Sequence, residues 1–263
     1  MESGKDIAIL QVGRLSSSIG DCDPLHLGAR SRFTMAPGGR ERTPMQIDLE
    51  GNPDFGEARV QMDSGERFRA ASGAMNWMEG DIELKARLLG GVATSLARRV
   101  LGGTSLFITE YTSGGDSRLA LSHAMAGTLV RTPVTREGLL IAGGAFTGCT
   151  DGVQLKTRFG GFKAFFSGKG AFFIEAAGAG EVIFGAYGAL VEKELDGELV
   201  VDNGHVLAWE HTLDWKLGTT GGFKNTFFSG EGLVMRFSGR GKLWLQTRHL
   251  AGTAGWISPF LRG

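Results

Sequence analysis

The sequence has few cysteines and no excess of charge of either sign. Only two of its 263 residues are cysteine, and Cys22 and Cys149 lie far apart without a Cys-x-x-Cys spacing. They therefore provide neither a disulfide framework nor a zinc-binding pattern. The 28 lysines and arginines balance the 28 aspartates and glutamates, so no chain-wide field attracts nucleic acid or an anionic membrane. We expect a protein of a reducing compartment, the cytoplasm.

Long apolar runs are also missing. The run at residues 7–12 is short for a signal peptide. The stretch at residues 182–191 is interrupted by Gly185 and Gly188, and it falls below the ~20 residues that a membrane-spanning helix needs. These runs predict a soluble protein.

Proline is scarce, and four of the six prolines lie within the first 53 residues. Residues 1–44 also contain serine and glycine runs and no tryptophan, which predicts a flexible amino-terminal extension. Glycine, in contrast, accounts for 43 residues, more than twice the usual share of about 7%. Because glycine enters tight turns without steric cost, this composition predicts an all-β protein of many short strands.

An internal repeat organises the chain after this extension. The segment Gly-Gly-Phe-Lys begins at Gly160 and returns at Gly221, and a Gly-x-Gly pair follows each copy. A first, more divergent copy begins at Gly90. Because a fixed period indicates repeated structural units, we expect three β units within residues 45–250. Their predicted bounds are 45–127, 128–188 and 189–250, followed by a carboxyl-terminal tail at 251–263.

We predict that the recurring glycines have structural roles. A Gly-Ala or Gly-His corner precedes each Gly-Gly pair by 16 or 17 residues. The Gly-x-Gly pairs predict hairpin turns, because a phosphate-binding loop would need a helix amino terminus on one side. The predicted structural positions are Gly73, Gly90, Gly91, Gly144, Gly160, Gly161, Gly168, Gly170, Gly178, Gly180, Gly204, Gly221, Gly222, Gly230, Gly232, Gly239 and Gly241.

Two local patterns complete the fold prediction. Alternation within residues 242–247 predicts a strand that turns Leu243 and Leu245 inward and Trp244 outward, where Trp244 is either covered by a neighbouring unit or exposed. A four-residue apolar spacing between Gly91 and Gly102 predicts one short helix. The expected fold is an all-β sandwich or rolled barrel with this single helix.

In their order along the chain, these segments resemble the family of altered inheritance of mitochondria protein 24 (AIM24), which includes many bacterial proteins. The matching segments are residues 64–66, 72–75, 89–91, 168–170, 201–205 and 243–248. The resemblance implies a triplicated double-stranded β-helix unit, similar to the subunit of the tryptophan-responsive RNA-binding attenuation protein (TRAP). It also implies homotrimers that form a ring, and it implies no agreed biochemical activity.

Reactive residues form only weak patterns. The nearest grouping joins His205 to Glu210, His211 and Asp214, but a cupin-type metal site would need a His-x-His pair. On a strand, His205 and His211 could share a face while Glu210 would point away. We expect hydrogen-bonded turn histidines, no metal and no cofactor. Cys149 has no basic neighbour in the sequence, so we expect a buried or turn thiol and no enzymatic activity.

Two features suggest binding to other molecules. Phe162-Lys163 recurs as Phe223-Lys224, and such pairs can stack on bases and contact phosphate in RNA, although the same alternation arises when Phe packs inward. The aromatic tail at residues 256–261 suits either a peripheral membrane contact or the cover of a neighbouring subunit.

Our working hypothesis is a non-enzymatic cytoplasmic scaffold or binding module whose partner is itself, as a homotrimer. An RNA-binding or membrane-associated protein and a cupin-like metal enzyme are the alternatives. Lys163, Lys224 and His205 are the candidate binding residues.

Overall fold

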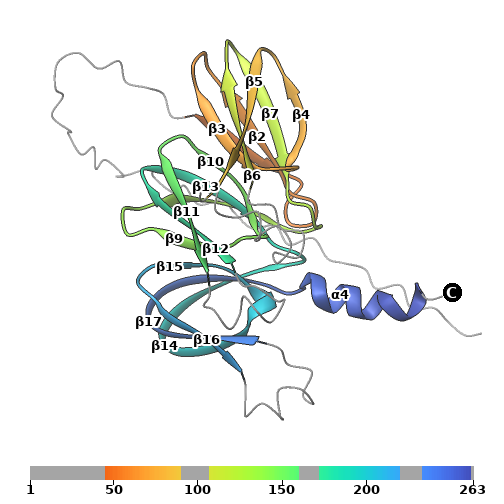
Figure 1. Ribbon diagram of the computed structural model, residues 1–263, viewed down its shortest axis with the longest axis vertical. Coiled ribbons are helices and arrows are strands. Elements are labelled where there is room, and N and C mark those ends of the chain that lie inside the picture. The colour runs from red at the N-terminus through yellow and green to blue at the C-terminus, as the bar shows by residue number, and fades with distance from the viewer. Residues whose placement is uncertain (1–44, 90–106, 160–171, 220–232, 262–263) are drawn as a thin grey trace, which may run out of the picture. The chain divides into compact units, whose positions relative to one another are not determined.

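The computed structural model describes residues 45–89, 107–159, 172–219 and 233–261 (Figure 1). These residues fold as an all-β chain with one short α-helix, in agreement with the predicted fold class. The strands are β1 (Gln46–Glu50), β2 (Glu57–Met62), β3 (Arg67–Ala71), β4 (Met75–Glu79), β5 (Ile82–Leu88), β6 (Phe107–Ser113), β7 (Ser117–Ser122), β8 (Leu129–Val134), β9 (Leu139–Ala142), β10 (Phe146–Thr150), β11 (Val153–Phe159), β12 (Phe172–Gly178), β13 (Gly180–Gly185), β14 (Leu190–Asp202), β15 (Val206–Glu210), β16 (Asp214–Thr219) and β17 (Leu233–Gln246). The helical elements are η2 (Asn203–His205), α4 (Leu250–Ile257) and η3 (Ser258–Phe260).

The strands form three antiparallel sheets. Their orders are β1-β2-β7-β4, β5-β6-β3-β10-β13-β8 and β11-β12-β9-β15-β17-β14, and β16 also pairs with β17. Two of the long-range pairings join strands of different predicted units, β3 with β10 and β9 with β15. Each sheet ends in two strands that have one edge without a strand partner among the described residues, and β4 and β14 are two of these six end strands.

One irregular pairing occurs three times. The strands β4, β10 and β15 pair with β7, β13 and β17, and each pairing contains a one-residue register shift, a β-bulge. Each bulge begins two residues after a corner glycine that the sequence singled out, Gly73, Gly144 or Gly204. The shifts lie between Met75 and Trp77, between Phe146 and Gly148, and between Val206 and Ala208. The three bulges therefore give a common reference for comparing these strands.

Relative to the bulge, the two long-range pairings have the same register. In the pairing of β3 with β10, Arg69 lies opposite Cys149. In the pairing of β9 with β15, Leu140 lies opposite Trp209. Cys149 and Trp209 each stand one residue past the end of their bulge, and on β4 the same place is taken by Met78.

Trp244 lies on the face of β17 opposite Leu243, as the alternation predicted, and of the two alternatives for it the structure shows the covered one, because its side chain is buried. Its side chain belongs to one apolar cluster and meets the ring of Phe184 edge to face at 5.7 Å, while the preceding Leu243 belongs to another cluster. Both faces of this part of β17 are thus covered by protein. Alternation separates inside from outside only where one face of a sheet meets water, and the cover here comes from β13, in a neighbouring unit of the predicted repeat.

The Gly-x-Gly pairs within the described residues are not hairpin turns, so that prediction is wrong. Gly178 and Gly180 lie where the chain leaves β12 in one sheet and enters β13 in another, and Gly239 and Gly241 lie inside the continuous strand β17. Gly178 (φ +115°) and Gly239 (φ +111°) have backbone angles that L side chains rarely adopt. At these points glycine lets a strand bend from one pairing partner to the next.

The helix α4 lies in the predicted tail except for its first residue, at a place where no helix was predicted. His249 caps it by accepting a hydrogen bond from Gly252 N, and none of its residues is buried. No helix within the described ranges is long and apolar enough to cross a membrane. The predicted helix between Gly91 and Gly102 and the extension at residues 1–44 lie outside the described residues, and the predicted unit bounds stay predictions.

Candidate functional site

The three corner glycines line a single cleft of about 540 Å³. Gly73 and Ala74 come from the turn before β4, Gly144 and Ala145 from the turn before β10, and Gly204 from η2 before β15. Equivalent corners that are 60 or 71 residues apart in the sequence thus contribute to one wall. Glycine and alanine supply 11 of the 24 residues that line the cleft, and these small residues leave room for a ligand beside them.

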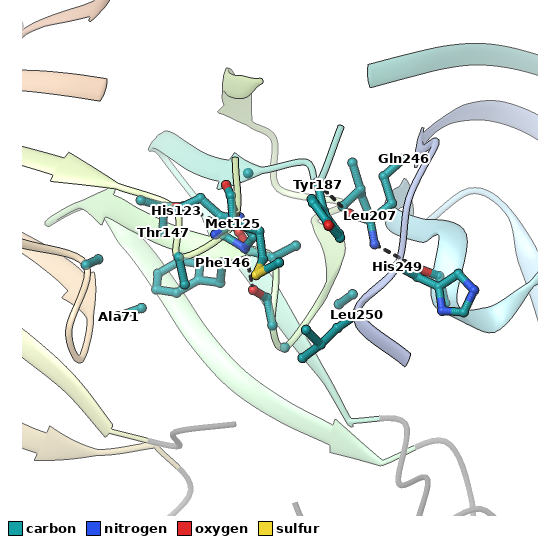
Figure 2. A pocket seen from close by; sticks show the side chains of 18 of the residues that line it. Ala71, His123, Met125, Phe146, Thr147, Tyr187, Leu207, Gln246, His249 and Leu250 are labelled. Atoms are coloured by element: carbon teal, nitrogen blue, oxygen red, sulfur yellow. Dashed lines mark hydrogen bonds between the residues drawn. The ribbon is translucent and has the colours of Figure 1, made fainter. Parts of the chain in front are cut away.

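His123 is the polar side chain at one part of the cleft, close to Phe146 and Thr147 (Figure 2). Its Nε2 donates a hydrogen bond to Gly144 O at 2.9 Å, and its Nδ1 accepts one from Met125 N at 3.3 Å. A Cβ at residue 185 would lie 2.4 Å from the His123 side chain, so Gly185 is required for this placement. His123 therefore holds the Gly144 corner in position.

Gln246 performs a similar task at the Gly204 corner (Figure 2). Its Nε2 donates to Gly204 O at 2.8 Å, and its Oε1 accepts from Tyr187 N at 2.8 Å. Thr253 of α4 donates from its hydroxyl to the hydroxyl of Tyr187 at 3.0 Å. These bonds connect the end of β17, the cleft wall and the carboxyl-terminal helix.

A cluster of two histidines and one carboxylate lies at the Gly204 corner. Asp202, His205 and His249 each offer a ligand atom, and these atoms lie within 4.8 Å of one another. The imidazole rings of His205 and His249 meet at a centroid distance of 4.8 Å. A Cβ at residue 204 would come within 2.9 Å of His249, so the glycine makes this approach feasible. Two imidazole nitrogens and one carboxylate oxygen form a donor set suited to a divalent transition metal.

The structure does not assemble the grouping that the sequence suggested for His205. Glu210 accepts a hydrogen bond from Lys242 N at 2.8 Å, and within the described ranges only Asp202 and His249 join His205 in a cluster of this kind. His205 lies in η2, so the alternation of a strand does not govern its direction. The spacing Asp-x-x-His at residues 202–205 was the available signal, whereas His249 arrives from the far end of β17.

Cys149 has the buried thiol that the sequence predicted. Its side chain is fully inaccessible, and this burial raises its pKa to about 12. A thiol with so high a pKa is a poor nucleophile at neutral pH. Lys163, Lys224 and their neighbouring phenylalanines lie outside the described residues, as do the predicted structural glycines Gly90, Gly91, Gly160, Gly161, Gly168, Gly170, Gly221, Gly222, Gly230 and Gly232.

The comparison with known families agrees with the resemblance seen in the sequence. A family described as mitochondrial biogenesis AIM24 matches residues 47–248, which include every described strand except the first residue of β1. The chain belongs to the AIM24 family. The AIM24 match contains the three corners of the cleft, Asp202 and His205, and it ends one residue before His249.

Two relatives of this AIM24 chain come from Streptococcus pyogenes. An uncharacterised protein of a serotype M6 strain is 27% identical over 226 residues, which cover 82% of this chain and 91% of the relative. The crystal structure of another S. pyogenes protein has 26% identity and a TM-score of 0.70, and the match covers 82% of this chain and all of that one. The similarity therefore extends over nearly the whole of both relatives.

Proposed function

We propose that this AIM24 protein is a non-enzymatic scaffold that assembles by pairing β14 of one copy with β4 of the next. The observation that carries this proposal is the repeated register of the two internal junctions, β3 with β10 and β9 with β15. The strands β3, β9 and β14 each end shortly before a corner glycine, so they are equivalent to one another. The strands β4, β10 and β15 each follow a corner glycine and carry the bulge, so they form the second equivalent set. Among the strands that end a sheet, β4 and β14 are the two that hold these positions, so they are the two halves of a third junction of the same kind.

The internal registers specify which residues meet across the third junction. They place Val200 opposite Met78, with Val201 opposite Trp77 and Leu199 opposite Glu79. Val200 is 48% exposed, Met78 43% and Trp77 38%. Apolar side chains on open strand edges favour pairing with another chain, because both backbone groups and apolar surface gain partners.

The finer architecture is part of the same proposal. The three bulges and the matching junctions support three units, each a double-stranded β-helix similar to TRAP, at the bounds predicted from the sequence. A head-to-tail contact of this kind makes a closed ring when the rotation between copies closes, and an open fibre when it does not. We propose closure as a homotrimer, the number that the family resemblance implies.

The proposal of a scaffold rather than an enzyme rests on the cleft wall. Glycine, alanine and serine form about half of this wall, and His123 and Gln246 use their polar atoms to hold corners in place. Because these polar atoms are already hydrogen-bonded to the main chain, the two side chains support the fold and are not free to activate a substrate. The free, buried Cys149 suits the cytoplasm that we propose as the location.

The test is the mass of the assembly in solution. Light scattering on the wild-type chain should give about 84 kDa, three times the 28.0 kDa chain. Met78→Lys and Val200→Glu should each lower this mass to that of a single chain, because each buries an unpaired charge in the junction. The double variant Met78→Lys/Val200→Glu should restore assembly, since the two new charges lie opposite each other.

The matched control is Leu84→Glu, which changes another exposed apolar residue of an edge strand, β5. This strand has no place in the proposed junction, so Leu84→Glu should keep the wild-type mass. A monomeric wild-type chain at micromolar concentration would refute the assembly. Equal loss of mass in Leu84→Glu, or no rescue in the double variant, would refute the register.

Peripheral membrane attachment is a second candidate function, favoured by α4 and η3. Trp256 is 72% exposed, and Phe260 and Leu261 are both 76% exposed. Interfacial helices insert such side chains at the boundary between headgroups and acyl chains. Cosedimentation with phosphatidylcholine and phosphatidylserine vesicles tests this role, and Trp256→Ser/Phe260→Ser should abolish it. Absence of cosedimentation for the wild-type chain would leave the cover of a neighbouring copy as the role of this tail.

A further inference from the structure

We propose that Asp202, His205 and His249 bind a divalent transition metal ion at the edge of the cleft, and that binding is coupled to the amino terminus of α4. The two imidazoles and the carboxylate suit Zn²⁺ most closely among the common ions, because zinc accepts nitrogen and oxygen ligands together. The assembly variants leave the three ligands unchanged, because Met78 and Val200 take no part in the site, although Asp202 ends the strand β14 of the proposed junction.

The three ligands come from three elements that meet at one corner. Asp202 ends β14, His205 lies in η2, and His249 precedes α4. Their ligand atoms lie within 4.8 Å of one another, whereas ligands on tetrahedral zinc at about 2.0–2.1 Å lie about 3.4 Å apart. Each residue is only partly buried, so a small rotation of the side chains closes this difference.

The surroundings of His205 hold it in the form that binds metal. Its Nδ1 donates to Gln246 O at 2.7 Å, which leaves the lone pair of Nε2 free for an ion. A hydrogen bond from the second ring nitrogen to a carbonyl is the usual support of a metal-binding histidine. Gln246 is itself fixed by bonds to Gly204 and Tyr187. The orientation of His205 is therefore determined before an ion arrives.

Among the described residues, Asp202 is a carboxylate without a cationic partner. Its Oδ1 accepts a hydrogen bond from Gly204 N at 2.7 Å, and no described residue donates a hydrogen bond to its second oxygen. No lysine or arginine within the described ranges forms an ion pair with it. A metal ion would supply the missing positive charge beside two imidazoles.

His249 links the ion to the helix. Its Nδ1 now accepts the capping hydrogen bond from Gly252 N at 3.2 Å. A neutral imidazole that binds metal through Nε2 carries its proton on Nδ1, so it can no longer accept this bond. Ligation by His249 therefore releases the cap of α4, and the ion and the intact helix end compete for one side chain.

Calorimetric titration of the full chain with ZnCl₂, after treatment with a chelator and dialysis, tests the site. We expect one ion per chain and a Kd in the micromolar range or tighter. Asp202→Asn, His205→Gln and His249→Gln should each weaken binding by about tenfold or more. Asp202→Asn retains the oxygen that accepts from Gly204 N, so its effect isolates the charge. Titration with Co²⁺ should give the intense visible bands of a four-coordinate ion.

His211→Gln is the control, because it removes an exposed histidine outside the cluster and should bind zinc like the wild-type chain. Hydrogen exchange at the amides of residues 250–253 should be faster with zinc than without it, and unchanged by zinc in His205→Gln. Absence of stoichiometric binding, or equal weakening in His211→Gln, would overturn the site. Binding without faster exchange would overturn its coupling to α4. Light scattering on the same samples separates these outcomes from any failure to assemble.

Discussion

Equivalent residues are buried in the middle of the described chain and exposed near its two ends. Cys149 and Trp209 stand one residue past a β-bulge and are fully buried, whereas Met78 stands at the same place on β4 and is 43% exposed. On the partner strands, Leu140 is buried and Val200 is 48% exposed. Burial at this position therefore depends on whether a neighbouring strand is present, since the local geometry of the bulge is shared.

The largest expected loss of stability comes from truncating Trp209, one of the two buried residues at this position. Trp209 meets Phe173 and Phe237 edge to face at 4.9 and 5.5 Å, and its indole nitrogen has no hydrogen-bond partner among the described residues. Trp209→Ala should therefore act through lost packing, and it should lower the free energy of unfolding by about 3–5 kcal/mol. Urea denaturation measures this change.

The stability of Met78→Ala should be compared with that of Trp209→Ala, because the two residues hold equivalent positions. Both variants are made in a Val200→Glu background, so that the chains are dissociated. Met78→Ala should then change stability by less than about 0.5 kcal/mol, because its side chain is exposed at an open edge. A cost for Met78→Ala close to that of Trp209→Ala would show that β4 is already covered within one chain.

Much of this arrangement could be predicted from the sequence. Repeated corners at Gly73, Gly144 and Gly204 were visible as short motifs at a constant spacing, and the structure places a bulge after each of them. The all-β class followed from glycine and from short apolar runs. These features are local, and they recur, so the sequence alone makes them recognisable.

The features that the sequence did not indicate depend on contacts between distant segments. The residue that covers Trp244 is Phe184 from another sheet, and the ligand cluster needs His249 beside a turn that lies far earlier in the chain. The helix α4 includes Gly252 and Gly255, which weaken its helical signal, and its cap is a histidine rather than the usual serine or aspartate. Periodicity carries no information about such partners.

Cys149, the other buried residue at this position, provides a second test with a smaller expected change in stability. Burial raises its pKa to about 12 from an ordinary value of 9.0, so the unfolded chain loses this proton more readily than the folded one. Stability that is complete below pH 9 should therefore fall as the pH rises toward 12, by about 1 kcal/mol near pH 10. The Cys149→Ala variant should lack this fall when both chains are unfolded with urea across the range.

Thiol labelling extends the same test to the end strand. In a Cys22→Ser background, Cys149 is the one remaining thiol, and it should react with a maleimide only after unfolding. A Cys22→Ser/Cys149→Ala/Met78→Cys chain should be protected while assembled and should react at once when Val200→Glu is added. Rapid labelling before that addition would contradict the proposed cover of β4.

The smallest expected change in stability comes from removing an ion pair, and here an inner pair is compared with a pair on the end strand β4. Glu175 on β12 is 12% exposed and accepts a hydrogen bond from Arg158, which lowers the pKa of this carboxyl. Because the folded pKa lies below the ordinary value of 4.5, the stabilisation is complete above pH 4.5 and is lost as the pH falls through the folded pKa. Glu175→Gln should cost about 1 kcal/mol or less at neutral pH, since Arg158 is largely exposed and screened by solvent.

The end strand provides the control for this pair. Glu79 on β4 lies 3.5 Å from Arg118, and both side chains are more than half exposed. Glu79→Gln should leave urea denaturation unchanged in the dissociated background, because exposed pairs of this kind contribute little. The difference between Glu175→Gln and the wild-type chain should shrink as the pH falls below 4.5. A difference that stays constant down to the acid limit would assign the effect to packing of the Glu175 side chain, and the inner and end pairs would then differ in burial rather than in charge.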